Sequence, residues 1–307
     1  MKNKAKIHWS KINEQGGLIG LKATLFSYRL LGKKITNWLM YPVMVYYFFV
    51  VKQAREASLQ YLSNLGTDMH HKKIFQHFMS FGQMITDKLA VWSGDISINN
   101  IQFENKDFFL ECAQKGKGGV ILISHLGNIE IARAFSQFFP QLTINAVIFD
   151  KHSKKFNALL EKINPAYKLN VIQANTISVA LSIQLQEKIA RGEFIVIAAD
   201  RTSPAYPERK MSAEFLGKPA YFPEGPFILA GILACPVYFM LCAKQTNKNY
   251  SIYFELIANR LYLGKKHREK NLPLYVKKYA DLLSSFCIKY PYQWYNFFDF
   301  WAVKKDE

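Results

Sequence analysis

The sequence predicts an α/β protein: a mixed, mainly parallel central sheet flanked by helices, with an N-terminal membrane-associated helical segment. Three observations predict this class. After residue 116, short apolar runs rich in β-branched residues alternate with helical segments. Several of these runs are apolar throughout, as are strands buried on both faces of a parallel sheet. Before residue 36, eight Lys or Arg residues stand against Glu14 alone, and an uncharged stretch follows.

The length and net charge of the chain restrict its domain organisation and the kind of partner it binds. The 307 residues suit one large domain with a helical extension, which we divide into residues 1–65 and an α/β domain of residues 66–307. The net charge of +17 calls for a partner of opposite sign, and nucleic acid, anionic lipid and an acidic carrier protein are the usual candidates. An aromatic content of 15% alongside this basic charge is common at membrane interfaces, and also in nucleic-acid binders.

The uncharged stretch near the start of the chain is residues 35–51, ITNWLMYPVMVYYFFVV. About 17 apolar residues is the lower edge for a membrane-spanning helix. Asn37, Pro42 and the three tyrosines instead favour a helix that lies in, or dips into, the bilayer surface beside its basic flank. The alternative is a buried helix of a soluble domain. A secretory signal is not expected, because no small-residue cleavage site follows.

The remaining elements follow from periodicity and from turn residues. Residues 68–115 are expected to be helical. Strands are expected at 120–124, 144–149, 169–172, 194–199, 237–242 and 250–257. Helices are expected at 129–139, in the basic segment around 151–155, and at 178–191, 225–234 and 274–289.

Two of the predicted strands end in polar residues, Ser124-His125 and Asp200-Arg201, at the sheet edge where α/β proteins place their sites. Glu130 follows His125 by five positions, so the two meet only if His125 precedes a helix and Glu130 lies in its first turns. Gly127 and Asn128 suit that bend. The pair would then act as a general base, with Glu130 fixing the tautomer of the imidazole. On spacing alone, a capping histidine beside a surface glutamate is the more frequent arrangement.

The segment HLGNIE resembles the H-x4-D/E block of the lysophospholipid acyltransferase superfamily, in the form found in bacterial lipid A lauroyl and myristoyl transferases. Three further segments resemble later blocks of that branch in the same order: FIVIAADRTSP, AEFLGKPAYFPEGPFILAGILACPVYF and YPYQWYNFFDFW. The opening HWSKINEQGGLIGLKATLFSYRLLGKK is similar to its N-terminal helix. The resemblance implies that His125 and Glu130 are catalytic and that no acyl-enzyme forms.

Several residues are candidates for substrate binding. Phe222–Gly225 resembles the FPEG block of glycerol-phosphate acyltransferases, where it helps to bind the acceptor phosphate, although Pro226 replaces the usual Thr or Ser; a plain helix entry is the alternative. Basic side chains near the second polar strand end could hold a phosphate, a carboxylate or a phosphopantetheine arm, unless they form a solvated loop. The candidates are Asn128, Arg133, Asp200, Arg201, Arg209, Lys210, Glu224 and Gly225.

The expected reaction is acyl transfer from acyl carrier protein or coenzyme A to a hydroxyl of a lipid or glycolipid, at the cytoplasmic face of the bacterial inner membrane. No bound cofactor or metal is expected, because Cys112, Cys235, Cys242 and Cys287 form no CxxC pair and GxGxxG is absent. Other acceptors, such as a lysophospholipid, an amine or a pigment head group, remain open. A nucleic-acid-binding module is the alternative from another class; the net charge allows it, but no nucleic-acid motif is present.

Overall fold

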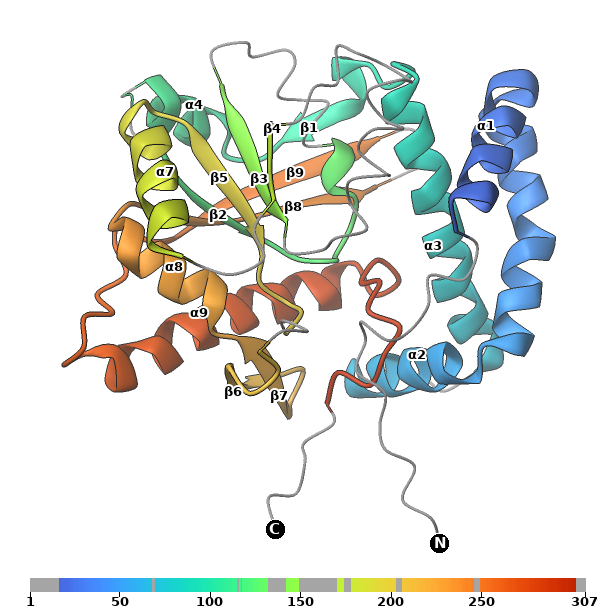
Figure 1. Ribbon diagram of the computed structural model, residues 1–307. Coiled ribbons are helices and arrows are strands. Elements are labelled where there is room, and N and C mark those ends of the chain that lie inside the picture. The colour runs from blue at the N-terminus through green and yellow to red at the C-terminus, as the bar shows by residue number, and fades with distance from the viewer. Residues whose placement is uncertain are drawn as a thin grey trace, which may run out of the picture.

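The structure, a computed structural model, describes residues 17–67, 70–114, 116, 118–131, 142–148, 170–173, 178–202, 206–245 and 249–301. A mixed, mainly parallel seven-stranded sheet forms the centre of the molecule, with helices packed around it (Figure 1). The predicted α/β class is therefore confirmed. The predicted helix 129–139 is described only at residues 129–131, and the basic segment around 151–155 lies outside the described residues.

The strand order of the sheet is β1-β9-β8-β2-β5-β3-β4, and every pair is parallel except β8 with β9. The carboxyl ends of β2, β3, β4, β5 and β8 therefore meet at one edge. The strands are β1 (Ile101–Phe103), β2 (Gly119–Ile123), β3 (Ile144–Ile148), β4 (Asn170–Gln173), β5 (Phe194–Ala198), β8 (Val237–Lys244) and β9 (Tyr250–Ala258).

Alternate residues of the central strands enter two separate cores, one on each face of the sheet. Val120 and Leu122 of β2 belong to one core, whereas Ile121 belongs to the other. This division follows from the period of two along a strand. It also explains why VILI is apolar throughout, because neither face of β2 meets water.

Three helices stand together beside the sheet and form what we call the helical layer (Figure 1). They are α1 (Gly17–Val50), α2 (Lys52–Asn64) and α3 (His71–Trp92). The helix predicted for residues 35–51 is thus the second half of a longer one, which is interrupted at Gly32, where φ is +74°. Tyr28 of α1 and Trp92 of α3 share one core, so the layer extends past the predicted boundary at residue 65. None of the described helices combines the length and apolarity needed to cross a membrane.

The prediction of helix throughout residues 68–115 is wrong in one place. The 3-10 turn Ile98–Asn100 and strand β1 separate α3 from α4 (Lys106–Gln114). Residues 101–103 alternate between buried and more exposed side chains and pair in parallel with β9. Helical periodicity could not reveal so short an edge strand, because its hydrogen-bond partner lies about 150 residues further along the chain.

Three further helices and a β-hairpin also pack around the sheet. The helices are α7 (Val179–Ala190), α8 (Gly225–Leu233) and α9 (Arg268–Lys289), and the hairpin consists of β6 (Lys210–Phe215) and β7 (Lys218–Pro223). Helix α7 begins at Ser178, whose hydroxyl accepts a hydrogen bond from the backbone N–H of Leu181. Helix α9 starts before the predicted residue 274 and includes Pro273. The hairpin was not predicted.

Candidate active site

His125 and Asp200 lie at the same edge of the sheet because β2 and β5 are adjacent parallel strands. Ile123 and Ala198, the last residues of the two strands, are partners in register. Each polar residue follows its strand by two positions, so the fold places the two side chains opposite each other. This is the edge at which α/β sheets carry their sites.

The carboxylate of Asp200 holds His125 at two points. Nδ1 of His125 lies 2.7 Å from Oδ1 of Asp200, and the backbone N–H of His125 donates to Oδ2 at 2.8 Å. Because an ionised carboxylate only accepts, the proton of the neutral imidazole lies on Nδ1. Nε2 then carries the lone pair, and no described residue donates to it. About a third of the His125 side chain (34%) is exposed, whereas that of Asp200 is fully buried.

Two further donors fix the buried carboxylate. Nε1 of Trp294 and Nδ2 of Asn296 donate to Oδ2 of Asp200 at 3.2 and 3.0 Å. Burial raises the pKa of Asp200, but the contact with His125 and the nearby Arg201 charge outweigh it and hold that pKa below its usual value. Asp200 is therefore ionised at neutral pH, as the partner of a base must be.

Burial lowers the pKa of His125 below its usual value, and the Arg201 guanidinium lowers it further, against the Asp200 carboxylate, which raises it. At neutral pH the imidazole is therefore uncharged and able to take a proton. Arg201 itself is held by Asn296. Its Nε donates to Oδ1 of Asn296 at 2.7 Å, and its guanidinium lies 5.8 Å from the centre of the Phe298 ring.

The loop that carries His125 is attached to two neighbouring segments by its backbone. The N–H of Tyr295 donates to the carbonyl of His125, and the N–H of Gly127 donates to the carbonyl of Gln293. The N–H of Asn128 donates to the carbonyl of Cys242 on β8. A Cβ on Gly127, where φ is +75°, would lie 2.0 Å from that carbonyl oxygen, so only glycine fits this bend.

Asn128 caps the short helical segment that follows. Its Oδ1 accepts from the backbone N–H of Glu130 at 3.2 Å, while its buried Nδ2 has no hydrogen-bond partner among the described residues. A buried amide left without a partner costs free energy unless a ligand or water satisfies it. The position of Asn128 is thus compatible with the substrate-binding role predicted for it.

Glu130 lies in the short helical segment 129–131 that follows the loop, as predicted. Its Oε2 accepts a hydrogen bond of 3.2 Å from Nε1 of Trp92, at the end of α3. Nδ1 of His125, which we expected Glu130 to hold, is held by Asp200 instead. The geometry therefore gives the tautomer-fixing role to Asp200, and Glu130 joins the His125 loop to the helical layer.

Two more contacts join the helical layer to the site. His77 of α3 lies between Ser58 and the C-terminal segment, with Nδ1 2.9 Å from the Ser58 hydroxyl and Nε2 2.9 Å from the carbonyl of Trp294. Asp87 of α3 pairs with Lys33 at 2.9 Å and with Lys244, the last residue of β8, at 2.8 Å. The layer thus packs directly against the edge of the sheet that carries His125 and Asp200.

The remaining basic candidates lie away from His125. Arg209 stacks over the ring of Tyr206 and Lys210 over that of Tyr221, both at the β6–β7 hairpin. The structure gives neither cation a contact with His125 or Asp200. Arg133 lies outside the described residues.

The FPEG segment also lies apart from His125. Glu224 pairs with Arg268 at 3.1 Å, and Gly225 begins α8 with Pro226 behind it. Arg268 begins α9, whereas His125 is bonded to Tyr295, beyond the other end of that helix. The contacts agree with the helix-entry interpretation of this segment.

Sequence reasoning missed Trp294 and Asn296 as partners of Asp200. The available signal was Asn296, a polar residue within the aromatic segment 290–301, but no spacing rule connects it to residue 200. Within the described residues, no group of three His, Cys, Asp or Glu side chains is placed to hold a metal ion. Comparison of the sequence with known family models and with curated proteins finds no match to either.

Proposed function

We propose that this protein is an acyltransferase, which moves a fatty acyl chain from a thioester of acyl carrier protein or coenzyme A to a hydroxyl of a lipid. The observation that carries the proposal is the His125–Asp200 pair. A partly exposed imidazole, held through Nδ1 by a buried carboxylate, presents Nε2 as a base. The sequence resemblance described above adds the acceptor type, a glycolipid of the lipid A kind, and the cytoplasmic face of the inner membrane as the place of reaction.

The reaction needs one base and no covalent enzyme intermediate. Nε2 of His125 takes the proton of the acceptor hydroxyl while its oxygen attacks the thioester carbonyl. The tetrahedral intermediate then collapses, the C–S bond breaks, and the departing thiolate takes the proton back from Nε2. The products are an ester and a thiol. Asp200 stays ionised throughout and stabilises the imidazolium.

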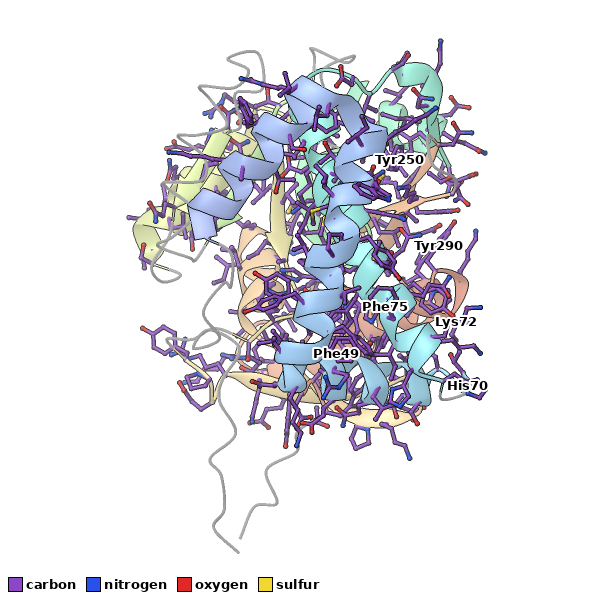
Figure 2. All side chains as sticks on the ribbon, turned by 90° about the vertical axis from the view of Figure 1, so that its right-hand side faces the viewer. Phe49, His70, Lys72, Phe75, Tyr250 and Tyr290 are labelled. Carbon is purple, nitrogen blue, oxygen red and sulfur yellow. The ribbon has the colours of Figure 1, made fainter. Side chains whose placement is uncertain are left out.

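The outer surface of α1 supports a membrane partner. Trp38, Phe49 and Phe26 are each about 70% exposed, and the side chains of Lys22, Arg29 and Lys34 on the same helix are also exposed. Figure 2 looks onto α1, with Phe49 at one end of the helix. Apolar side chains on a basic helix are typical of interfacial membrane binding, in which aromatic rings enter the headgroup region. The exposed apolar residues of α1 are Phe26, Leu30, Leu31, Ile35, Trp38, Leu39, Tyr41, Val43, Tyr46, Phe49 and Val50.

The test is transfer of a labelled acyl chain from acyl carrier protein, and separately from coenzyme A, into a lipid extract. His125→Ala should abolish ester formation, whereas His267→Ala, which changes an exposed histidine at the start of α9, should retain it. Circular dichroism of both variants controls for folding. Full turnover by a folded His125→Ala variant would refute the mechanism.

The membrane part of the proposal has its own test. Trp38→Glu with Phe49→Glu should release the protein from anionic vesicles in a flotation assay. Ile183→Glu, a matched change at an exposed residue of α7, should not. Equal vesicle binding by the wild type and the double variant would exclude α1 as the attachment surface.

A further inference from the structure

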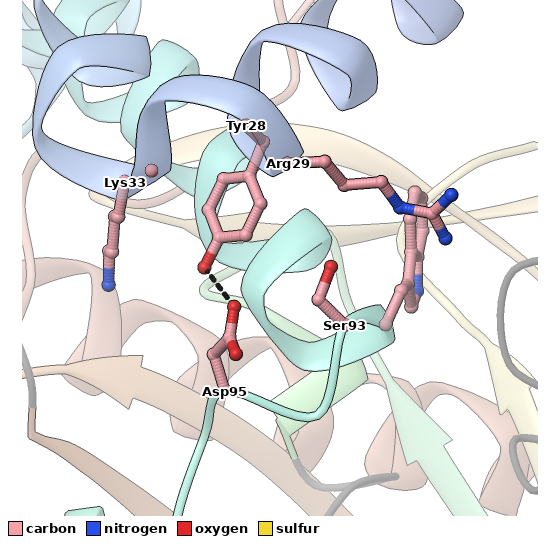
Figure 3. Close-up of a pocket in the computed structure, with 7 residues that line it drawn as sticks. Tyr28, Arg29, Lys33, Ser93 and Asp95 are labelled. Atoms are coloured by element: carbon pink, nitrogen blue, oxygen red, sulfur yellow. Dashed lines mark hydrogen bonds between the residues drawn. The ribbon is translucent and has the colours of Figure 1, made fainter.

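A polar cavity of about 460 Å³ lies between α1 and the end of α3 (Figure 3). Asp200 and Tyr295, which bond to His125, do not line it. Its volume falls within the range of small-ligand sites, about 300–1,000 Å³. Its walls come from α1, from the last residue of α3 and from the turn that follows α3. The lining residues are Tyr28, Arg29, Gly32, Lys33, Trp92, Ser93 and Asp95.

Two glycines with positive φ shape this cavity. Gly32 interrupts α1 at φ +74°, and Gly94 turns the chain at the end of α3 at φ +78°. Both have open space where a Cβ would stand. Between them, the hydroxyl of Tyr28 donates to Oδ2 of Asp95 at 2.8 Å and closes one side of the cavity. Figure 3 shows Lys33 and Arg29 extending on either side of Tyr28.

Two of the lining groups have no partner among the described residues. The guanidinium of Arg29 makes no hydrogen bond or ion pair with them, and the buried Oγ of Ser93 makes no hydrogen bond. Lys33 is different, because it pairs with Asp87, which it shares with Lys244. Two lysines on one carboxylate leave an excess of positive charge behind the cavity wall.

The cavity adjoins both the catalytic loop and the exposed apolar surface. Trp92, one of its walls, donates through Nε1 to Glu130, five residues after His125. In α1, Phe26 and Leu30 are close in sequence to the lining residues Tyr28 and Arg29, and they are 69% and 67% exposed. A ligand with a polar head in the cavity can therefore lay its hydrocarbon chains along α1.

We propose that this cavity binds the headgroup of the lipid acceptor, and that this headgroup carries a phosphate and free hydroxyls. The proposal rests on the proposed acyl transfer. The planar guanidinium of Arg29 binds a phosphate through two parallel hydrogen bonds. The Ser93 hydroxyl supplies a further donor, and the Asp95 carboxylate, of which the Tyr28 hydroxyl occupies one oxygen, accepts from a ligand hydroxyl.

The probe is dihexanoyl phosphatidylglycerol below its micelle concentration, with binding measured by isothermal titration calorimetry. This lipid has one phosphate charge and two glycerol hydroxyls. Arg29→Gln should weaken its binding on the order of tenfold, and Ser93→Val, which replaces the donor with a methyl group, severalfold. Lys34→Gln removes the same charge from an exposed position of α1 outside the cavity and should change binding less than about twofold.

Two comparison ligands separate a lipid headgroup from a free phosphate. Dihexanoyl phosphatidylcholine, which has no headgroup hydroxyl and no net charge, should bind more weakly than the phosphatidylglycerol. If glycerol 3-phosphate or inorganic phosphate binds as tightly as the lipid, the lipid assignment is overturned. An equal loss for Lys34→Gln and Arg29→Gln overturns the cavity as the site.

The binding measurement is independent of turnover, so the two proposals can fail separately. His125→Ala should bind the lipid as the wild type does. Lost transfer with intact, Arg29-dependent binding would refute the acyltransferase alone. Unchanged acyl transfer by Arg29→Gln, together with unchanged lipid binding, would refute the cavity alone.

Discussion

Oδ1 of Asp200 lies 2.7 Å from Nδ1 of His125, although 75 residues separate the two along the chain. The contact exists because β2 and β5 run side by side and end at the same level. It makes a buried, ionised carboxylate the partner of a partly exposed base.

Asp200→Asn should lower acyl transfer by about 100-fold or more, because general base catalysis typically contributes about 10²–10⁴-fold. An asparagine amide would also direct its own N–H groups toward the donors of His125, Trp294 and Asn296, so the melting temperature should fall. Steady-state kinetics and thermal denaturation measure the two effects. Asp281→Asn, which changes an exposed carboxylate of α9, is the control. Equal activity of the two variants would contradict the pairing.

Glu130→Gln should reduce transfer less than Asp200→Asn does. A glutamine keeps an oxygen that can accept from the Trp92 indole, and Nδ1 of His125 remains on Asp200. The comparison requires only kcat for both variants in one assay. A greater loss for Glu130→Gln would show that Glu130 acts on the reacting groups, as its place in the H-x4-E block first suggested.

The pH profile of kcat/KM should carry the signature of a lowered histidine pKa. The uncharged imidazole is the active form, so the acid limb should lie below the usual histidine value of about 6.5. Arg201 contributes to that lowering, so Arg201→Gln should move the limb to higher pH. Arg209→Gln removes a cation that has no contact with His125 and should leave the limb in place. A shift to lower pH in Arg201→Gln would refute the assignment.

His77 should make the protein sensitive to acid. Burial lowers its pKa to about 4, whereas the unfolded chain has the usual value of about 6.5. The unfolded state therefore binds the proton more readily than the folded state. The contribution of His77 to the free energy of unfolding is present above pH 6.5 and is lost as the pH falls toward 4. Its size is about 3 kcal/mol, from about 1.4 kcal/mol per pKa unit.

Chemical denaturation of the wild type and of His77→Gln between pH 7 and pH 4 measures this contribution. The glutamine Nε2 can still donate to the carbonyl of Trp294, but the side chain does not titrate. The difference in unfolding free energy between the two proteins should therefore shrink as the pH falls. A constant difference would exclude His77 as the source of the acid sensitivity.

Gly127→Ala should destabilise the protein by more than about 1 kcal/mol, because the new Cβ would collide with the Cys242 carbonyl and φ is positive. Since the same bend carries His125, transfer activity should fall too. Gly20→Ala is the matched control, because Gly20 lies inside α1 with open space around it. Thermal unfolding of both variants checks the prediction. A stable Gly127→Ala variant would mean that the loop can move away from β8.

The central strands β2, β5 and β8 were predictable from the sequence because they are largely apolar runs. VILIS and FIVIAA are such runs, and their polar ends, His125 and Asp200, pointed to the right edge. The hairpin 210–223 was not predictable in this way, because its strands mix charged and apolar residues. Gly217 makes the tight turn, and Phe215 and Phe222 contact each other and also Phe300, which is distant in sequence.

The partner of His125 could not be deduced from the sequence for a related reason. The local spacing suggested Glu130, five positions along the chain, as the partner. The register of β2 with β5 instead places Asp200 next to His125. Register between β2 and β5 depends on tertiary packing, which a single sequence does not display. The same limit concealed the roles of Trp294 and Asn296.

The backbone bonds between residues 125–127 and 293–295 also bear on the order in which the protein is built. His125 is synthesised before residues 293–296, so its carbonyl, the Gly127 N–H and the Asp200 carboxylate have no bonds to that segment until it is made. A nascent polypeptide that has not yet exposed residue 296 holds both members of the pair without the groups that fix them. Under the proposed function, acyl transfer is therefore expected only once synthesis has passed residue 296.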